Sequence, residues 1–266
     1  MDNGCCSVKM PKYSEVIQGV LGEINECRSN PEAYAAKLEQ LLDLYHGRIR
    51  HRPDDVPVVT KEGVDAVHEA IAALKAAQAT SPLELSAGLA AACQQHCNDL
   101  GPRGTTGHKG ADQSTFQQRL EKYGKWMGHL IEALDFGSIT AQEVVCSLLV
   151  DDGLPSREHR TAVLSANYKK IGVGFGAHDE LKSMCTLVMA TKFTDHAEFP
   201  RVQVPEGQVQ GTWEARNWVD GAIRLTCEIT SEMESGKVVK RVTKIWEMED
   251  GSEPRKTEEI IYDHTS

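Results

Sequence analysis

The chain has 266 residues, of which 40% are hydrophobic and 26% charged, a composition typical of a soluble globular protein. Lys and Arg total 29 and Asp and Glu total 39, for a formal net charge of -10. Nucleic-acid binders carry a basic face, and anionic lipid attracts basic clusters. This charge balance therefore argues against nucleic acid as a partner and against electrostatic docking on a membrane.

The sequence carries no recognisable targeting segment. Its apolar runs are much shorter than the roughly 20 residues that span a bilayer, so we expect no transmembrane segment. Residues 1–13 lack the apolar core of a signal peptide, and Asp2 stands where N-myristoylation needs a glycine. We therefore expect a cytoplasmic protein without a signal peptide.

The eight cysteines form no Cys-x-x-Cys pair, so a zinc ribbon is not expected. In a reducing compartment the internal six are predicted to be free thiols, mostly small buried groups. Cys93 and Cys97 flank His96 on a predicted helix, which is either part of a metal site or a core-facing surface. Cys5 and Cys6 are either an acylation site or two further thiols.

Helical periodicity dominates the first part of the chain. Ser14 is predicted to cap a helix whose apolar residues recur at helical spacing, and Asn30-Pro31 begins a second helix. Residues 46–59 change from basic to acidic and hold two prolines, so they are predicted to form a loop. Thr60 is predicted to open a third helix.

Further helices follow, separated by a glycine-rich loop. Residues 86–100 are predicted to form a helix, and residues 101–110, with four glycines and a proline, a loop. Ser114 is expected to cap a short helix, and Thr140 a longer one.

Strand-like runs appear after a turn at residues 151–156 and the short helix that the turn introduces. Residues 171–176 and 184–193 are predicted to be strands. The main part of the chain therefore mixes helices with a few strands, which predicts the α+β class.

The pattern changes near Pro200. Residues 222–231 alternate apolar and polar side chains, and residues 238–248 and 258–262 are also strand-like, with turn signals between them. We predict a C-terminal antiparallel β-meander, which either extends the main domain or docks on a partner, because three strands with one apolar face need a surface to pack on. The predicted parts are an N-terminal arm, a main domain and a β-meander extension, at residues 1–13, 14–199 and 200–266.

Histidines and carboxylates gather between Gly107 and Arg160. Such a set can bind a divalent metal through neutral imidazole nitrogens, or perform acid–base chemistry. No two of these residues have the spacing of a metal-binding pair on one helix, and a chain with ten His and 39 acids offers such sets by chance. Spacing alone therefore leaves open a functional cluster and a set of surface or satisfied core residues.

Six segments, in this order, resemble those of a known family: residues 25–36 (NECRSNPEAYAA), 82–89 (PLELSAGL), 107–114 (GHKGADQS), 123–126 (YGKW), 148–160 (LLVDDGLPSREHR) and 171–190. Over about residues 14–195 the chain resembles the CAP superfamily of cysteine-rich secretory proteins, antigen 5 and pathogenesis-related 1 proteins. It is most similar to an intracellular, SCP-like branch found in protists and bacteria. The resemblance implies an α-β-α sandwich and does not extend over the C-terminal meander.

The resemblance also implies a cleft with two histidines and two acids, in which some members bind zinc or another divalent cation. The matching motifs place the histidines at His108 and His159 and the first acid at Glu132. The second acid is Asp151 or Asp152. We therefore predict a metal site of His108, His159, Glu132 and Asp151.

Three positions depart from the family pattern. Ala133 replaces an Asn, which removes a side chain able to hydrogen-bond in the cleft, and Gln113 replaces a Gly where a positive φ is easy only for Gly. Glu158 replaces a Gly beside His159. It is interpreted as an extra ligand, an inward ion-pair partner or a solvated charge.

Two further features leave alternatives open. Trp213, Trp218 and Trp246, in or near the meander, either anchor it to the core or serve as interface residues. The basic cluster at residues 48–52 is either a solvated loop or a contact for an acidic protein surface.

Three functions follow as hypotheses. The first is a non-enzymatic component of a larger protein assembly, cytoskeletal or ciliary, suggested by the missing signal peptide, the departures in the cleft and the added meander. The second is a metal-dependent hydrolase, in which His108 and His159 hold the metal and Glu132 is the general base. The third is a binder of a small ligand such as a lipid or sterol. No catalytic residue is predicted beyond the hydrolase hypothesis.

Overall fold

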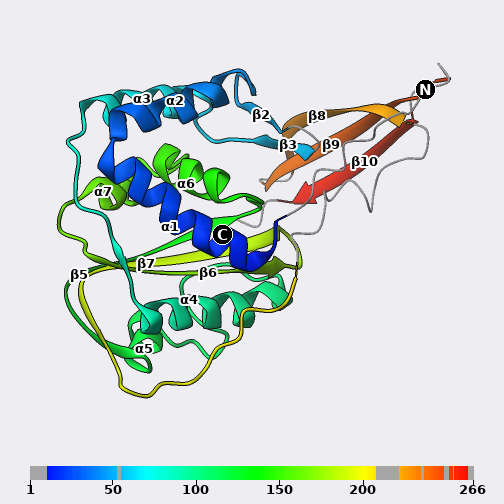
Figure 1. Cartoon of the computed structure of the whole chain (residues 1–266). Helices are drawn as coiled ribbons and strands as arrows, with labels where there is room; N and C mark the ends of the chain where they lie inside the picture. The colour runs from blue at the N-terminus through cyan, green and yellow to red at the C-terminus, as the bar shows by residue number, and fades with distance from the viewer. Residues whose placement is uncertain are drawn as a thin grey trace, which may run out of the picture. The chain divides into compact units, whose positions relative to one another are not determined.

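The computed structural model describes residues 11–52, 55–207, 222–234, 237–248, 252–253 and 255–262. The chain divides into two compact units (Figure 1). The first unit comprises Met1–Arg52 and Val58–Gly211, and the second comprises Pro53–Pro57 and Thr212–Ser266. Cys5 and Cys6 lie outside the described residues.

A four-stranded sheet is the centre of the first unit. Its strands, in the order β4-β6-β7-β5, are Glu84–Leu85, Lys170–His178, Lys182–Asp195 and Gly124–Phe136. β7 pairs antiparallel with both β6 and β5, and β4 runs parallel to β6. β6 and β7 confirm the two strands predicted in this part of the chain. β5 is an edge strand of this sheet.

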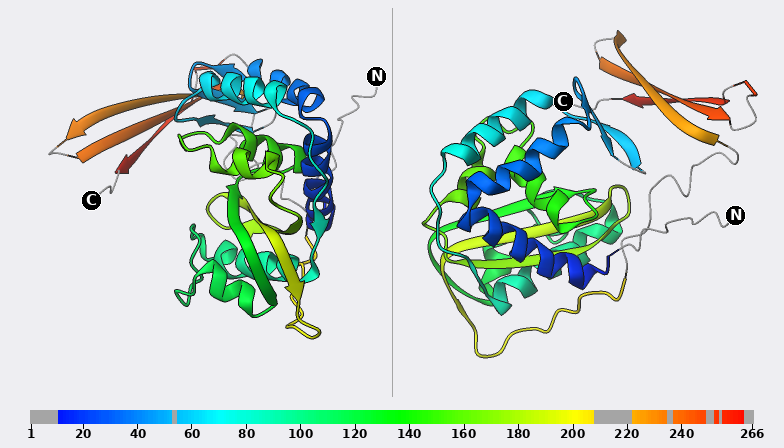
Figure 2. Two further views of the ribbon diagram at one scale, coloured as in Figure 1. Left: turned by 90° about the vertical axis from the view of Figure 1, so that its left-hand side faces the viewer. Right: turned by 45° about the horizontal axis from the view of Figure 1, so that its top comes forward.

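Helices cover both faces of the sheet. On one face lie α1 (Tyr13–Ser29), α6 (Ala141–Val150) and α7 (Glu158–Leu164), and on the other lie α4 (Ala87–Leu100) and α5 (Phe116–Glu121) (Figures 1 and 2). α2 (Pro31–Leu42) and α3 (Val64–Ala76) pack on each other and extend the first layer. The α+β prediction and its α-β-α sandwich are thereby confirmed.

The side-chain alternation of β7 explains why two layers form. Leu187 and Met189 join the core cluster of α1 and α6, whereas Val188 and Ala190 join the cluster around Leu89 of α4. Successive residues of a strand point to opposite faces, so a strand that is apolar at every position must be covered on both sides.

Arg28 of α1 ties this layer together, although its side chain is fully buried. Its guanidinium donates to the carbonyl oxygens of Ser81, Val163 and Ser165 at 2.9, 2.6 and 2.8 Å. Burial lowers the pKa of Arg28. The charge is thus solvated by backbone carbonyls that fix the end of α7 against α1.

The predicted helix starts at Asn30, Ser86 and Thr140 are confirmed, and the side chain of each accepts a backbone N–H of its helix. Three other helix starts were predicted wrongly. α1 begins after Lys12, so Ser14 lies within the helix. α3 begins after Gly63, because the Thr60 hydroxyl instead donates to the carbonyl of Arg48 at 2.8 Å.

The third wrong helix start is the cap predicted at Ser114. α5 is capped by Thr115, whose hydroxyl accepts the Gln118 N–H while the Gln118 side chain accepts the Thr115 N–H. This reciprocal arrangement satisfies two backbone donors at once. The Ser114 N–H donates to Asp112 at 2.9 Å and so belongs to the preceding turn.

Two predictions about strands were wrong or incomplete. Residues 46–59 are not a loop but contain β2 (Ile49–Arg52) and β3 (Asp55–Val59), and β1 (Tyr45–His46) pairs with β2 around Gly47. The long strand β5 and the short strand β4 were not predicted. The strands at 45–59 lack apolar alternation, so no periodic signal marks them in the sequence.

The second unit contains the predicted meander. Its strands β8 (Ala222–Glu234), β9 (Lys237–Met248) and β10 (Arg255–Tyr262) form an antiparallel sheet in the order β10-β9-β8. Trp246 lies in β9 opposite Leu225 of β8 and Arg255 of β10. Trp213 and Trp218 lie outside the described residues. Within the described part of the chain, no helix is long and apolar enough to cross a membrane.

Candidate functional site

The first histidine–acid pair lies at the edge strand β5. Glu132 points to the face covered by α4 and α5, and its side chain is only 1% exposed. Its Oε1 lies 3.0 Å from Nδ1 of His108, and its Oε2 forms an ion pair with Arg119 of α5. Both oxygens of the carboxylate are therefore engaged, while the His108 ring is half exposed.

The loop that carries His108 contacts α4 through a buried histidine. His96 is fully buried, and its Nε2 lies 2.8 Å from the carbonyl oxygen of Gly107. Burial, aided by the Arg119 charge, lowers the pKa of His96, so the ring is neutral near neutral pH and Nε2 carries the proton that it donates. Gln113, in the same loop, has a φ of 66°, which agrees with the left-handed backbone expected at this position.

The second pair joins the ends of α6 and α7. His159 Nδ1 lies 2.7 Å from Oδ1 of Asp151, and Oδ2 of Asp151 accepts the backbone N–H of His159 at 2.9 Å and that of Arg160 at 3.4 Å. Asp151 follows α6 in a left-handed conformation, with a φ of 55°. The backbone of Asp151 therefore ends α6, and its buried carboxylate caps α7 and orients the His159 ring.

Asp152, the alternative second acid, has a different role. Its carboxylate accepts the backbone N–H groups of Lys61 and Glu62 at 2.7 and 2.8 Å. The histidine partner is therefore Asp151. Glu158 is exposed at the first position of α7, where a negative charge is favourable at a helix N-terminus.

An arginine–glutamate network fixes the turn between α6 and α7. Arg157 donates to the carbonyl oxygen of Asp151 at 2.8 Å and to carboxylate oxygens of Glu62 and Glu69 on the α3 side. Arg160 forms a second ion pair with Glu69. The Arg157 hydrogen bond and the Gly153 N–H lower the pKa of Glu62 from its ordinary 4.5 to about 2, and Arg157 also lowers that of Glu69.

This network makes the stability contribution of Arg157 depend on pH. A lowered carboxyl pKa stabilises the fold above about pH 4.5, and the contribution is lost as pH falls toward 2. We expect the stability gap between the wild type and Arg157→Gln to narrow as pH falls through this range, measured by urea unfolding. Arg103→Gln is the control, because Arg103 is an exposed arginine that pairs with Asp99. The difference in stability between this variant and the wild type should be small at every pH. An Arg157 gap that is constant with pH would contradict the prediction.

Ala133 does not face the cleft. Its side chain is 1% exposed and belongs to the core cluster on the α1 and α6 face, opposite to the side that Glu132 faces. An alanine here fills a core position.

The four predicted ligands form two pairs. Among the described residues, no group of three or more His, Cys, Asp or Glu side chains could hold a metal ion. Each histidine turns Nδ1 toward a buried carboxylate, and in a neutral ring this contact favours the tautomer with the proton on Nδ1 and the lone pair on Nε2. This is the arrangement of metal-binding histidines, but two imidazoles are fewer than the three or four protein ligands of zinc sites. The four-residue metal site stays a prediction.

Cys93 and Cys97 are core residues. Both are buried, and Cys97 Sγ lies 3.3 Å from the hydroxyl of Thr186. Burial raises the pKa of the Cys97 thiol to about 12 and that of Cys93 well above its ordinary value. These thiols remain protonated at neutral pH, so the core interpretation holds.

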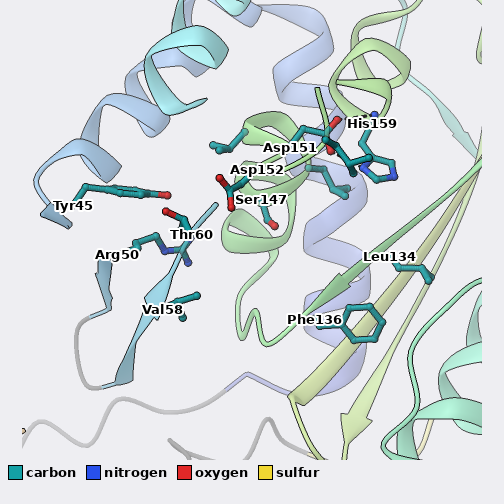
Figure 3. Close-up of a pocket in the computed structure, with 13 residues that line it drawn as sticks. Tyr45, Arg50, Val58, Thr60, Leu134, Phe136, Ser147, Asp151, Asp152 and His159 are labelled. Carbon is teal, nitrogen blue, oxygen red and sulfur yellow. Dashed lines mark hydrogen bonds and ion pairs between the residues drawn. The ribbon is translucent and has the colours of Figure 1, made fainter. Parts of the chain in front are cut away.

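A pocket of about 260 Å³ lies next to the second pair (Figure 3). Its walls come from α6 and the turn after it, from the end of β5, and from the strands at 45–59. The lining residues are Tyr45, Arg50, Val58, Thr60, Leu134, Phe136, Ser147, Leu148, Val150, Asp151, Asp152, Leu154 and His159. The sequence did not predict this pocket, because one wall comes from the segment interpreted as a loop.

Comparisons with known proteins found one family and two solved structures to which parts of this chain are similar. The sequence pattern of the cysteine-rich secretory protein family (CAP) matches residues 21–189. An outer surface protein from Borrelia burgdorferi is 19% identical, with a TM-score of 0.40, over 68% of this chain and 98% of that one. An extracellular SCP-domain protein from Bacillus anthracis str. Ames is 16% identical, with a TM-score of 0.34, over 42% of this chain and 35% of that one.

No curated protein matches the chain. The narrower assignment to an intracellular branch stays a prediction. The family match covers more than half of the chain and includes both histidine–acid pairs. The chain belongs to the cysteine-rich secretory protein (CAP) family.

Proposed function

We propose that this CAP-domain protein is a non-enzymatic component of a larger intracellular protein assembly, and that its C-terminal sheet is the docking element. We propose that this assembly is cytoskeletal or ciliary. The observation that carries the proposal is the second unit, whose three strands form a sheet separate from that of the CAP domain.

The state of the site carboxylates supports a role without catalysis. A hydrolytic general base must accept a proton from water. Both oxygens of Glu132 are already engaged, by His108 and Arg119, in a side chain that is 1% exposed. Asp151 accepts from the ring and the backbone of His159 and from the backbone of Arg160. The Glu132 and Asp151 side chains are only 1% and 2% exposed, so neither carboxylate has much surface open to a water molecule.

The second unit suits main-chain recognition. Within its sheet β8 and β10 are edge strands, and edge strands present N–H and C=O groups that can pair with a strand of another chain. The apolar face of a sheet must be buried against another element. A partner protein would supply that cover.

Fractionation of the native protein tests the proposal. We expect the tagged full-length chain to pellet with a cytoskeletal or other large assembly at physiological salt, and a chain ending at Gly211 to stay soluble. The shortened chain keeps Gly207, whose carbonyl accepts the Tyr13 N–H at 3.1 Å, and its folding is checked by thermal unfolding. If both chains are soluble and monomeric, the assembly role fails. If both pellet, the CAP domain is the docking element instead.

The anchored histidines favour a second function, binding of a divalent cation. We expect purified protein to bind Zn²⁺, and His108→Ala/His159→Ala to lose that metal, measured by elemental analysis after equilibration. His129→Ala is the matched control, because His129 is an exposed histidine on β5 with its ring beside Tyr168. Full retention of metal in the double variant would place the site elsewhere.

A further inference from the structure

The pocket beside the second histidine–acid pair has the chemistry of a small-molecule site. All of its lining residues belong to the first unit. Its volume of about 260 Å³ lies just below the range of roughly 300–1,000 Å³ for small-molecule pockets.

Arg50 supplies a cationic group in this pocket. Its side chain comes from β2, and its Nε is buried without a hydrogen-bond partner among the residues that the structure describes. A buried, unpaired guanidinium nitrogen is costly unless an acceptor binds it. The guanidinium fork matches a carboxylate, which can accept two parallel N–H bonds.

Two acids, Asp151 and Asp152, also line the pocket. A ligand that carries only a negative charge would therefore not complement the charges of the pocket. Asp151 is compensated by His159, and Asp152 accepts one backbone N–H at each oxygen. Each oxygen of Asp152 therefore keeps a lone pair for a further donor. Figure 3 shows Asp152 on the same side of the pocket as Thr60 and Arg50. A ligand with a carboxylate and an ammonium group would complement both charges.

The pocket also has apolar lining. Val58 supplies part of it from β3. Leu148, Val150 and Leu154 add to the apolar lining. Apolar surface with a few placed polar groups is the usual character of small-molecule pockets.

We propose that this pocket binds a free α-amino acid with an apolar side chain. The carboxylate of the ligand would pair with Arg50, its ammonium group with Asp152, and its side chain would pack on Val58 and Leu154. The inference does not depend on the proposed assembly role, because it concerns only residues of the CAP domain and the strands that extend it.

Calorimetry on the full-length protein, with L-leucine, L-methionine and L-phenylalanine as probes, tests the proposal. We expect at least one probe to bind, and Arg50→Gln to weaken it by about tenfold or more, the effect of losing a charged hydrogen-bonded pair. Arg50→Lys should retain part of the affinity. Arg103→Gln, on a solvent-exposed arginine that does not line the pocket, is the matched control and should bind like the wild type.

Analogues of phenylalanine separate the two charges on the wild-type protein. N-acetyl-L-phenylalanine lacks the ammonium group and L-phenylalaninol lacks the carboxylate, and both should bind at least tenfold more weakly. Failure of all three amino acids to bind at millimolar concentration would overturn the proposal. Binding that is unchanged in Arg50→Gln would also overturn it, as would binding of 3-phenylpropionate as tight as that of phenylalanine. The analogue series uses the wild-type chain, so it tests the proposed amino-acid binding even if the Arg50 variants fail to fold.

Discussion

Arg119→Met is expected to destabilise the protein by about 3–5 kcal/mol, because it leaves the Glu132 charge buried beside a single histidine. The Arg119 and Glu132 side chains are 4% and 1% exposed, so water cannot replace the lost partner. Methionine keeps most of the apolar stem of Arg119, so the loss of stability comes mainly from removing the positive charge of the guanidinium. Urea unfolding at neutral pH measures it.

Two further variants show whether the unpaired charge is the cause. Adding Glu132→Gln to Arg119→Met removes the charge and should recover about 2 kcal/mol or more of the loss. Lys170→Met breaks a pair whose side chains are 32% and 75% exposed, and it should cost less than about 1 kcal/mol. A double variant less stable than Arg119→Met itself would mean that the Glu132 carboxylate still stabilises the fold through His108, and that an unpaired charge is not the cause of the loss.

This pair also explains how the fold places His108. Arg119 pairs with Glu132 and donates to the His108 carbonyl, although the latter bond is long at 3.4 Å. Glu132 in turn holds the His108 ring at Nδ1. One buried arginine therefore fixes both the acid and the loop of the histidine, and its loss is expected to release the first histidine–acid pair as well as to destabilise the fold.

Much of the fold was predictable because its elements have clear local signals. Asn30, Ser86 and Thr140 cap their helices through their own side chains, and the helical periodicity that follows each is regular. β5 carries no such signal. Its pairing with β7 shifts register between Met127 and Leu130, where Gly128 has a φ of 84°, so the alternation breaks in mid-strand.

The site was predictable only in part. The family resemblance predicted His108, Glu132, His159 and Asp151, and the structure joins them as two pairs. Nothing in the local sequence indicated that Arg157 would bind Glu62, 95 residues earlier, because such partners are set by how α3 packs near α7. Arg50 was assigned to a basic loop, since its place in a pocket depends on strands that the sequence does not reveal.

The close contact between β6 and α4 gives the second large expected effect. A Cβ at Gly174 would lie 2.4 Å from the backbone nitrogen of Gln94 and 2.5 Å from the carbonyl carbon of Cys93. These are helix backbone atoms, so no side-chain rotation can relieve the overlap, and α4 must move away from the sheet. We expect Gly174→Ala to cost about 3 kcal/mol in urea unfolding, near the upper end of measured overpacking effects.

Gly176→Ala is the matched control for this prediction. Gly176 lies on the same strand and the same face, but the nearest atom to its added Cβ is Cys97 Cβ at 3.8 Å, an ordinary contact. Alanine also loses less backbone entropy than glycine on folding, so this variant should be within about 1 kcal/mol of the wild type. Because α4 carries His96, which holds the Gly107 carbonyl, displacement of α4 in Gly174→Ala should also disturb the His108 loop. Equal losses in the two variants would mean that α4 does not pack on this strand as closely as the structure has it.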